Sequence, residues 1–309
     1  MNTVLVCDPI SEDALKILKN SNVNFRYEPD ISPDELLSKV GTCEALIVRS
    51  RTKVTAKVLA DAPKLRVIGR AGVGIDNIDV EGAKNRGIKI INTPEALTNA
   101  VAEFTLALML ELSRKIHLAD SSMREGKWAK SSLHGIELRG RTYGTIGVGR
   151  IGQRVVELAT AFGMRILAND IIPIPEGFVQ KYNVHLCSRQ QVFEDSDFVD
   201  LHVPLTSETT NLVNYDATKK MKKTSFLINT SRGRVVNEMD LLRALNEGLI
   251  EGAALDVFEQ EPPTERELLR NPKLIITPHI AGQTDESQAK AGIVIAKEVL
   301  RFLGYGTQF

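Results

Sequence analysis

Short apolar runs alternate with amphipathic segments through the first 91 residues of the chain. The apolar runs have the length of buried strands and lie at residues 4–7, 23–27, 45–48, 67–69 and 88–91. Between them, apolar residues are spaced as on one face of a helix at residues 13–19, 34–40, 56–60 and 80–84. Strands that alternate with helices predict a parallel sheet covered on both faces, and hence a first domain of the α/β class.

Helix-start signals support this prediction. Ser11 and Ser32 stand where N-caps are expected, and Pro33 follows at a first helical position. The pattern breaks at Asn92-Thr93-Pro94, which predicts the end of the first domain.

The longest helix is predicted at residues 98–118, where Ala, Leu, Met and Val form a nearly continuous apolar surface. Such a surface indicates burial on several sides, as between two domains or two subunits. A polar, irregular region at residues 120–139 follows and holds the only tryptophan, Trp128. Local packing and a subunit contact both remain open for this side chain.

A second alternation begins at Arg141. Its predicted strands lie at residues 143–146, 164–168, 198–203, 225–230, 252–257 and 274–277, with a clear helix at 238–247. The last amphipathic segment, residues 285–303, is too short to form a domain, so we expect it to pack back on the first one. The predicted domains are therefore residues 1–96 with 285–309, and residues 97–284.

The turn after the first strand of this second alternation carries the pattern G-x-G-x-x-G, with Gly147, Gly149 and Gly152. A helical run follows it and reaches Gly163, where a helix C-cap is expected. In dinucleotide-binding folds the first glycine permits the tight turn and the second lets backbone amides approach a pyrophosphate. The third lets the helix pack closely on the strand.

Asp170 lies at the end of the next predicted strand, 18 residues beyond the third glycine. At this place a carboxylate accepts hydrogen bonds from the ribose 2′-hydroxyl and repels a 2′-phosphate. The predicted cofactor is therefore NAD rather than NADP, in a Rossmann domain.

The composition excludes several classes of binding partner. The chain of 309 residues has 39 basic and 39 acidic side chains, so it lacks the positive surface of a nucleic-acid or anionic-membrane binder. Three scattered cysteines predict neither a disulfide framework nor a zinc site, and we expect no metal. No secretory signal opens the chain, and its most apolar stretch, residues 104–110, is far too short to span a bilayer. We expect a cytoplasmic protein.

Charged residues follow three of the later strands. Arg232 follows residues 225–230 and offers a planar fork for a carboxylate. Glu261 follows residues 252–257, and His279 follows residues 274–277. Because parallel sheets bind ligands beyond the carboxyl ends of their strands, we expect these side chains to meet there.

Histidine is suited to proton transfer near neutral pH, and a glutamate beside it stabilises the imidazolium form. The other four histidines, at positions 117, 134, 185 and 202, are expected to be structural, because they lack an equivalent combination of acid and strand end. A nicotinamide that supplies hydride, an arginine that holds a carboxylate and a protonated histidine together can reduce a 2-oxo acid or, in reverse, oxidise a 2-hydroxy acid.

At this point the sequence resembles a known family, the D-isomer-specific 2-hydroxyacid dehydrogenases. The segments that carry the resemblance follow the family's order along nearly the whole chain: GRAGVGIDNID (69–79), NTPEALTNAVAE (92–103), the GVGRIG turn, HVPLT (202–206), NTSRGRVV (229–236), GAALDVFEQEPP (252–263) and TPHIAGQT (277–284).

The resemblance implies that Arg232, Glu261 and His279 are the catalytic trio. It also implies a flavodoxin-like first domain that binds substrate, a C-terminal helix that rejoins it, and a homodimer supported by the helix from Thr98. The implied cofactor contacts, together with the glycines, are Val73, Arg150, Ile151, Asp170, Val203, Thr230, Ser231, Arg232, Asp256, His279 and Gly282.

Within the family, the first domain resembles the D-3-phosphoglycerate dehydrogenase branch, through IVRSRTKVT (47–55) and the arginine of GRAG. That branch exchanges hydride between 3-phosphoglycerate and 3-phosphohydroxypyruvate, the first step of serine biosynthesis. A phosphorylated substrate needs extra cations, and Arg49, Arg51 and Arg70 are candidates. The implied substrate residues are Arg49, Ser50, Arg70, Ala71, Gly72, Arg232 and His279, with amides at 71 and 72 for the carboxylate.

Two features depart from the family pattern. Tyr143 and Thr145 stand where smaller or aliphatic residues are usual. The sequence stops at Phe309, so we expect no C-terminal regulatory domain and no inhibition by serine. The alternatives are a glyoxylate or hydroxypyruvate reductase of the same family and, from another class, an NAD(H)-sensing protein like the family's co-repressors.

Overall fold

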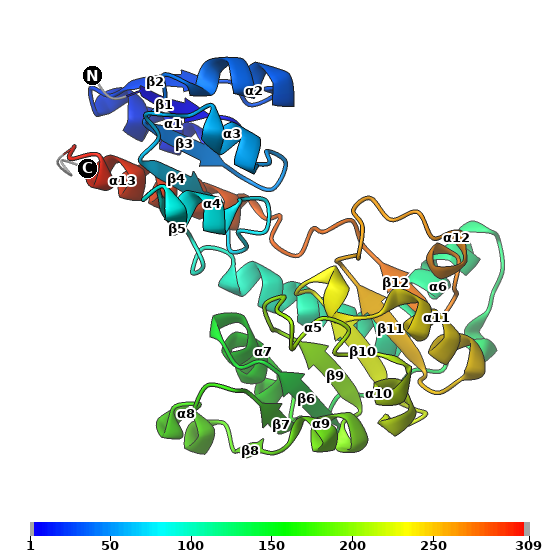
Figure 1. Ribbon diagram of the computed structural model, residues 1–309. Helices are drawn as coiled ribbons and strands as arrows, with labels where there is room; N and C mark the ends of the chain where they lie inside the picture. The colour runs from blue at the N-terminus through cyan, green and yellow to red at the C-terminus, as the bar shows by residue number, and fades with distance from the viewer. Residues whose placement is uncertain (1–2, 306–309) are drawn as a thin grey trace. The chain divides into compact units, whose positions relative to one another are not determined.

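The computed structural model describes residues 3–305, which form two compact units (Figure 1). Unit 1 takes the residues up to Thr98 and those from Gly282 onward, and unit 2 takes Asn99–Ala281. We expected boundaries at 96/97 and 284/285. The role of each unit stays a prediction.

Unit 1 contains a five-stranded parallel sheet in the order β2-β1-β3-β4-β5. This is the flavodoxin-like order, in which the chain reverses its direction across the sheet between β1 and β3. The strands are β1 (Thr3–Val6), β2 (Asn24–Tyr27), β3 (Ala45–Val48), β4 (Val67–Arg70) and β5 (Lys89–Asn92). The central strands β1 and β3 are buried throughout, which explains why they read as continuous apolar runs.

Helices cover both faces of this sheet, so two apolar cores lie on opposite sides of it. They are α1 (Glu12–Asn20), α2 (Pro33–Val40), α3 (Ala56–Ala60), α4 (Val80–Asn85) and α13 (Asp285–Phe302). Ser11 caps α1, and Ser32 forms a capping box with Glu35 at the start of α2. Helix α13 packs against α1 and β4, where Gly69 leaves room for Ile295 and Val299.

Unit 2 contains a seven-stranded parallel sheet in the order β12-β11-β10-β9-β6-β7-β8. The chain moves one way from β6 to β8 and the other way from β9 to β12, so the reversal lies between β6 and β9. This is the Rossmann order, and the predicted class of two doubly wound α/β sheets is confirmed. The strands are β6 (Thr142–Ile146), β7 (Arg165–Asn169), β8 (Val184–Leu186), β9 (Phe198–Leu201), β10 (Phe226–Asn229), β11 (Gly252–Leu255) and β12 (Leu274–Ile276).

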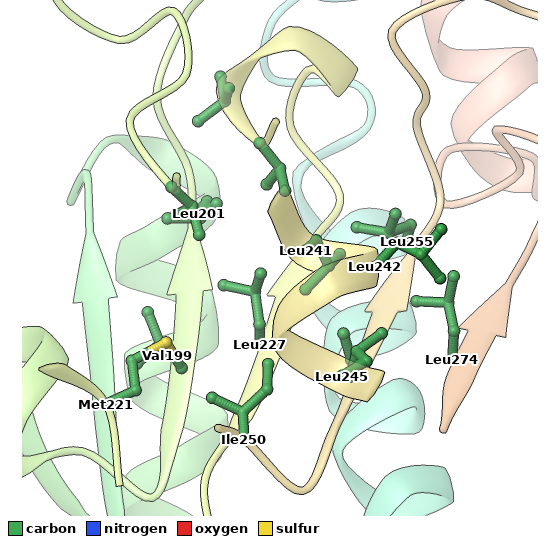
Figure 2. Packing of buried hydrophobic residues seen from close by; sticks show 14 of the residues in the cluster. Val199, Leu201, Met221, Leu227, Leu241, Leu242, Leu245, Ile250, Leu255 and Leu274 are labelled. Atoms are coloured by element: carbon green, nitrogen blue, oxygen red, sulfur yellow. The ribbon is translucent and has the colours of Figure 1, made fainter. Parts of the chain in front are cut away.

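The helices of unit 2 also lie on both faces of its sheet (Figure 1). They are α5 (Thr98–Arg114), α6 (Ile116–Arg124), α7 (Arg150–Ala161), α8 (Glu176–Lys181), α9 (Arg189–Asp195), α10 (Tyr215–Lys220), α11 (Glu238–Glu247) and α12 (Arg266–Leu269), with the 3₁₀ turns η1 (Lys130–Ser132) and η2 (Gly233–Val235). Figure 2 shows leucines of α11 packed against side chains of β9, β10 and β11. The period of these leucines, Leu241, Leu242 and Leu245, places them on the buried face of the helix.

The long helix predicted at residues 98–118 is interrupted. Lys115 adopts a left-handed conformation with φ 54°, and the chain continues as α6. Glu111 stabilises the new helix start, because its Oε1 accepts the backbone N–H of His117 and lies 2.5 Å from the ring Nδ1 of the same residue. Helix α6 buries none of its residues. Across residues 3–305, no helix has both the length and the apolar character to cross a membrane.

Candidate functional site

The glycine turn of unit 2 joins β6 to α7 at the reversal point of the sheet. Gly147 has φ +96°, and a Cβ there would lie 2.4 Å from the carbonyl oxygen of His202. A Cβ on Gly152 would lie 2.4 Å from the Gly147 oxygen. Both positions therefore exclude a side chain, the first through backbone conformation and contact and the second through contact alone.

Gly149 differs from these two glycines. It is the N-cap of α7, no side chain caps the helix there, and a Cβ would meet no atom within 4 Å. The space beside this helix start is therefore open. The first N–H groups of a helix have no partner within the helix, and such a helix start can bind a pyrophosphate.

Asp170 directly follows β7 and is held beside the glycine turn. Its Oδ2 accepts the N–H of Val148 at 2.6 Å, and its Oδ1 accepts the N–H of Ile172 at 2.8 Å. A carboxylate oxygen has a second lone pair, so both oxygens can still accept from a ribose diol. The exposed side chains of Ile171 and Ile172 add apolar surface next to it. The residues present therefore fit a dinucleotide, with Asp170 on the ribose and the start of α7 on the pyrophosphate.

The three predicted catalytic residues all follow neighbouring strands of this sheet. Arg232 comes after β10, Glu261 after β11 and His279 after β12, and these strands are adjacent in the sheet. The Nδ1 of His279 lies 2.9 Å from Oε2 and 3.1 Å from Oε1 of Glu261. The two side chains are about half exposed, so the pair is open to a ligand.

The environment of Glu261 favours its ionised form. Burial raises the pKa of this carboxyl, but the hydrogen bond and charge of His279, the N–H of Phe258 and the charge of Arg232 outweigh it, and the pKa is lowered overall. The Arg232 charge thus acts on the same carboxylate that contacts His279. This arrangement brings a permanent cation close to a histidine–glutamate pair, and such a pair can transfer a proton.

Asp256 holds the loop that carries His279. This fully buried carboxylate accepts from the hydroxyl of Thr277 at 2.6 Å and from the N–H groups of Ile280 and Ala281 at 2.9 and 2.8 Å. His279 has φ 55°, an uncommon conformation for a residue with a side chain. The three bonds to Asp256 hold the chain on both sides of it in place. Burial raises the pKa of Asp256, although these bonds oppose the rise.

Asn229 organises the loop of Arg232 in a similar way. Its side chain donates to the carbonyl of Arg232 at 2.9 Å and accepts the N–H of Ser231 at 3.0 Å and its hydroxyl at 2.7 Å. The Arg232 guanidinium donates to the Ser231 carbonyl at 2.6 Å. The neighbouring Thr230 hydroxyl lies 3.1 Å from that of Thr105.

The remaining predicted cofactor residues are divided between the units. Arg150 and Ile151 open α7, and Val203 follows β9, all in unit 2. Val73 and Gly282 belong to unit 1, where the oxygen of Val73 accepts from Asn92 and that of Gly282 accepts from Ser287 and Gln288.

The predicted substrate arginines of unit 1 differ in how they are used. Arg49 follows β3 at the reversal point of the sheet, and its guanidinium donates to the Pro9 carbonyl and to the Gln283 side chain, each at 3.3 Å. The Arg51 guanidinium pairs with buried Asp8 at 3.1 Å and donates to three backbone carbonyls. Four N–H contacts thus hold the Arg51 guanidinium within unit 1, and its expected role as a cation for a ligand stays a prediction.

The segment from Arg70 to Gly72 is also bound internally. The N–H of Ala71 donates to the Val48 carbonyl at 2.9 Å, and that of Gly72 donates to the Thr93 hydroxyl at 2.8 Å. These two amides are therefore engaged within unit 1, and their expected role in holding a carboxylate stays a prediction. The Arg70 guanidinium lies directly over Gly72, where a Cβ would be 1.4 Å from its Nη1. Ser50, beside Arg49, is exposed.

His202 does have an acid beside it at a strand end, contrary to the reason given for expecting it to be structural, but its side chain is buried and the structural role itself stays a prediction. His202 directly follows β9, and its Nε2 lies 2.8 Å from Oδ2 of Asp200, although without hydrogen-bond alignment. The same oxygen of Asp200 accepts from the hydroxyl of Tyr143 at 2.7 Å, and all three side chains are buried. Tyr143, which departs from the family pattern, therefore has its partner on the adjacent strand β9. The pattern D-x-H at residues 200–202 could have predicted the pairing of Asp200 with His202, because residues i and i+2 of a strand share a face.

No group of three or more His, Cys, Asp or Glu side chains in the described part of the chain could hold a metal ion.

Comparisons with known proteins agree with this geometry. Residues 106–281 match the model of the D-isomer specific 2-hydroxyacid dehydrogenase, NAD binding domain. A D-3-phosphoglycerate dehydrogenase of Methanocaldococcus jannaschii is 43% identical over 98% of this chain and 58% of its own length. A hydroxypyruvate reductase of Thermotoga maritima is 41% identical over 97% of this chain and 98% of its own length.

The crystal structure of the TT0316 protein from Thermus thermophilus has a TM-score of 0.90 and 34% sequence identity, and it covers 98% of this chain and 97% of its own. The chain belongs to the D-isomer-specific 2-hydroxyacid dehydrogenase family, and unit 2 contains the family's NAD-binding domain. The whole chain spans little more than half the length of the D-3-phosphoglycerate dehydrogenases that it matches.

Proposed function

We propose that this protein is an NAD-dependent dehydrogenase of D-2-hydroxy acids. The observation that carries the proposal is the contact of His279 with Glu261, in the field of Arg232, on three adjacent strand ends of an NAD-binding unit. Glu261 contacts Nδ1 of His279, so Nε2 is the ring nitrogen that faces the substrate oxygen.

In the direction of reduction, Arg232 holds the carboxylate of a 2-oxo acid by two parallel hydrogen bonds. Bound NADH supplies the hydride for C2. His279, protonated and oriented by Glu261, donates a proton to the oxygen of the former carbonyl, which becomes the 2-hydroxyl. In the reverse direction, neutral His279 takes the proton from that hydroxyl.

The substrate that we propose is 3-phosphoglycerate, with 3-phosphohydroxypyruvate as its oxidised partner. Arg49 supports this choice, because it lies at the reversal point of the unit 1 sheet and its guanidinium makes hydrogen bonds of 3.3 Å, which are long. Arg70 and Ser50 are the neighbouring candidates for contacts with the phosphate. The similarity to the archaeal D-3-phosphoglycerate dehydrogenase over 98% of this chain adds to the argument.

Hydroxypyruvate or glyoxylate reduction is the second candidate. The hydroxypyruvate reductase of Thermotoga maritima is almost as similar, and the match covers 98% of its length. The internal contacts of the Arg51 guanidinium also leave it fewer N–H groups for a phosphate, which weakens the case for a phosphorylated substrate.

Steady-state NADH oxidation with phosphohydroxypyruvate, hydroxypyruvate and glyoxylate, compared by kcat/KM, separates these candidates. We expect the phosphorylated acid to have the highest value. A higher kcat/KM for either unphosphorylated acid would replace phosphoglycerate dehydrogenase with reductase activity. NADH binding without turnover of any 2-oxo acid would favour a nucleotide-sensing protein.

We also propose that the protein is a cytoplasmic homodimer. Helix α6 and the loop after it expose Ile116, Met123 and Trp128, of which Trp128 is 78% exposed. Three free cysteines are compatible with a reducing compartment. Light scattering should give twice the chain mass of 34.1 kDa, and Trp128→Glu with Met123→Glu should reduce it to one chain mass. A mass of 34.1 kDa for the unchanged protein would contradict the homodimer.

A further inference from the structure

We infer that Glu238 and Glu259 form a reciprocal clamp that positions Glu261 and Arg232, and that Glu238 is therefore a positioning residue of the catalytic site. This inference rests on the proposed function. Neither acid is among the residues that the sequence pattern assigned to the site.

Each of the two acids accepts a hydrogen bond from the other's backbone. The N–H of Glu238 donates to Oε1 of Glu259 at 3.0 Å, and the N–H of Glu259 donates to Oε1 of Glu238 at 2.5 Å. Glu238 is the first residue of α11, and Glu259 lies in the loop after β11. The clamp therefore ties a loop that lacks regular structure to the start of a helix that is anchored by its buried leucines.

The clamped loop segment lies directly against the arginine loop. A Cβ on Gly233 would be 1.9 Å from the carbonyl carbon and oxygen of Phe258 and 2.5 Å from the nitrogen of Glu259. Only a glycine permits this approach of the 258–259 peptide to the residue after Arg232. The N–H of the same peptide, that of Glu259, is the group that donates to Glu238.

The clamped segment also supports the catalytic acid. The N–H of Phe258, adjacent to Glu259, donates to Oε1 of Glu261 at 3.2 Å. This bond helps to keep the pKa of Glu261 low, as do His279 from the loop after β12 and Arg232 from the loop after β10. A shift of the 258–259 peptide would therefore change both the place and the ionisation of Glu261.

The energetics of Glu238 are those of a residue retained at a cost. The residue is 9% exposed, and burial raises the pKa of its carboxyl. The bond from the Glu259 N–H opposes the rise, whereas the carboxylates of Glu259 and Glu265 add to it. Burying a carboxylate among other carboxylates costs free energy. The hydrogen bond to the Glu259 N–H offsets part of that cost at Glu238.

The test is the variant Glu238→Ala. Misplacement of a catalytic group should lower kcat/KM for the best 2-oxo acid by about 10- to 100-fold, with the Kd for NADH unchanged. Loss of the Phe258 N–H bond should move the acid limb of the kcat/KM profile to higher pH, because that bond lowers the pKa of Glu261. A role limited to helix stability would lower Tm without moving this limb.

Four further variants sharpen the experiment. Glu238→Gln keeps an oxygen that accepts the Glu259 N–H, so it should restore the rate and the profile. Glu259→Ala should resemble Glu238→Ala. The double variant should be no worse than either single variant, because each single substitution already breaks the same clamp. Met239→Ala, an exposed neighbour on α11, is the matched control and should behave as the unchanged protein.

Amide hydrogen exchange of residues 256–263 gives a readout that does not depend on turnover. It should accelerate in Glu238→Ala and return to normal in Glu238→Gln. Unchanged exchange together with an unchanged pH profile would overturn the inference. If the unchanged protein reduces no 2-oxo acid, the proposed function fails, and exchange alone still decides whether the clamp holds the loop.

Discussion

The strand ends of the two units place charged residues in equivalent positions, but they use them differently. In unit 2, buried Asp256 and Asn229 bond to the backbone, and His279 and Glu261 pair with each other at the surface. In unit 1, the Arg51 guanidinium itself bonds to the backbone and to Asp8. A charged residue at a strand end thus indicates a ligand only after its existing hydrogen bonds have been counted.

The largest effect is expected in unit 2. His279→Ala removes the proton donor, so turnover should fall by about 10²- to 10⁴-fold while the Kd for NADH stays the same. Steady-state kinetics and NADH fluorescence titration measure the two quantities. His185→Ala, at an exposed position of β8, is the control. Turnover that survives in His279→Ala would remove His279 from the mechanism.

A smaller effect should separate the arginines of unit 1. Arg49→Ala should lower kcat/KM for phosphohydroxypyruvate by about 10- to 100-fold, the value of hydrogen bonds to a charged group, with little change for hydroxypyruvate. Arg51→Ala should instead lower the free energy of unfolding by about 1–3 kcal/mol, because it leaves buried Asp8 without its cation. Denaturant unfolding measures the stability change, and the ratio of kcat/KM for phosphohydroxypyruvate to that for hydroxypyruvate measures the change in specificity. If this ratio were the same in Arg49→Ala and Arg51→Ala, the two arginines would not differ in their roles.

The smallest effect concerns pH and stability. The folded pKa of Glu261 is lowered, so its ionised form stabilises the protein above the usual carboxyl range, and this contribution is lost as pH falls through the folded pKa. Glu261→Gln should therefore have a slightly lower Tm than the unchanged protein at pH 7, and the difference should shrink at acid pH. The effect is small because the side chain is 41% exposed. A difference in Tm that grows on acidification would contradict the assignment.

Local patterns predicted which elements carry the candidate site residues. The spacing of Gly147, Gly149, Gly152 and Asp170 predicted a turn that the structure confirms as the link between β6 and α7. The strand-end positions of Arg232, Glu261 and His279 placed them together, because neighbouring parallel strands end at one edge. The break at Lys115 was missed, since the apolar pattern continues through it and the capping group, Glu111, lies six residues before His117.

Long-range partners account for the other misses. Asp200 is 57 residues from Tyr143, and Glu238 is 21 residues from Glu259, so no periodicity in the sequence connects them. The same holds for Arg51, whose partner Asp8 and acceptor carbonyls lie on other elements.

The sequence by itself determined the α/β class, the family and the three residues expected to carry the chemistry, because hydrophobic period, glycine spacing and strand ends are local properties of the chain. Only the tertiary structure decided which charged groups are already bonded, namely Arg51 to Asp8, Asp200 to Tyr143, and Glu238 and Glu259 to each other's backbone. Hydrogen bonds between distant segments depend on distances of a few tenths of an ångström, and those are set by packing rather than by pattern.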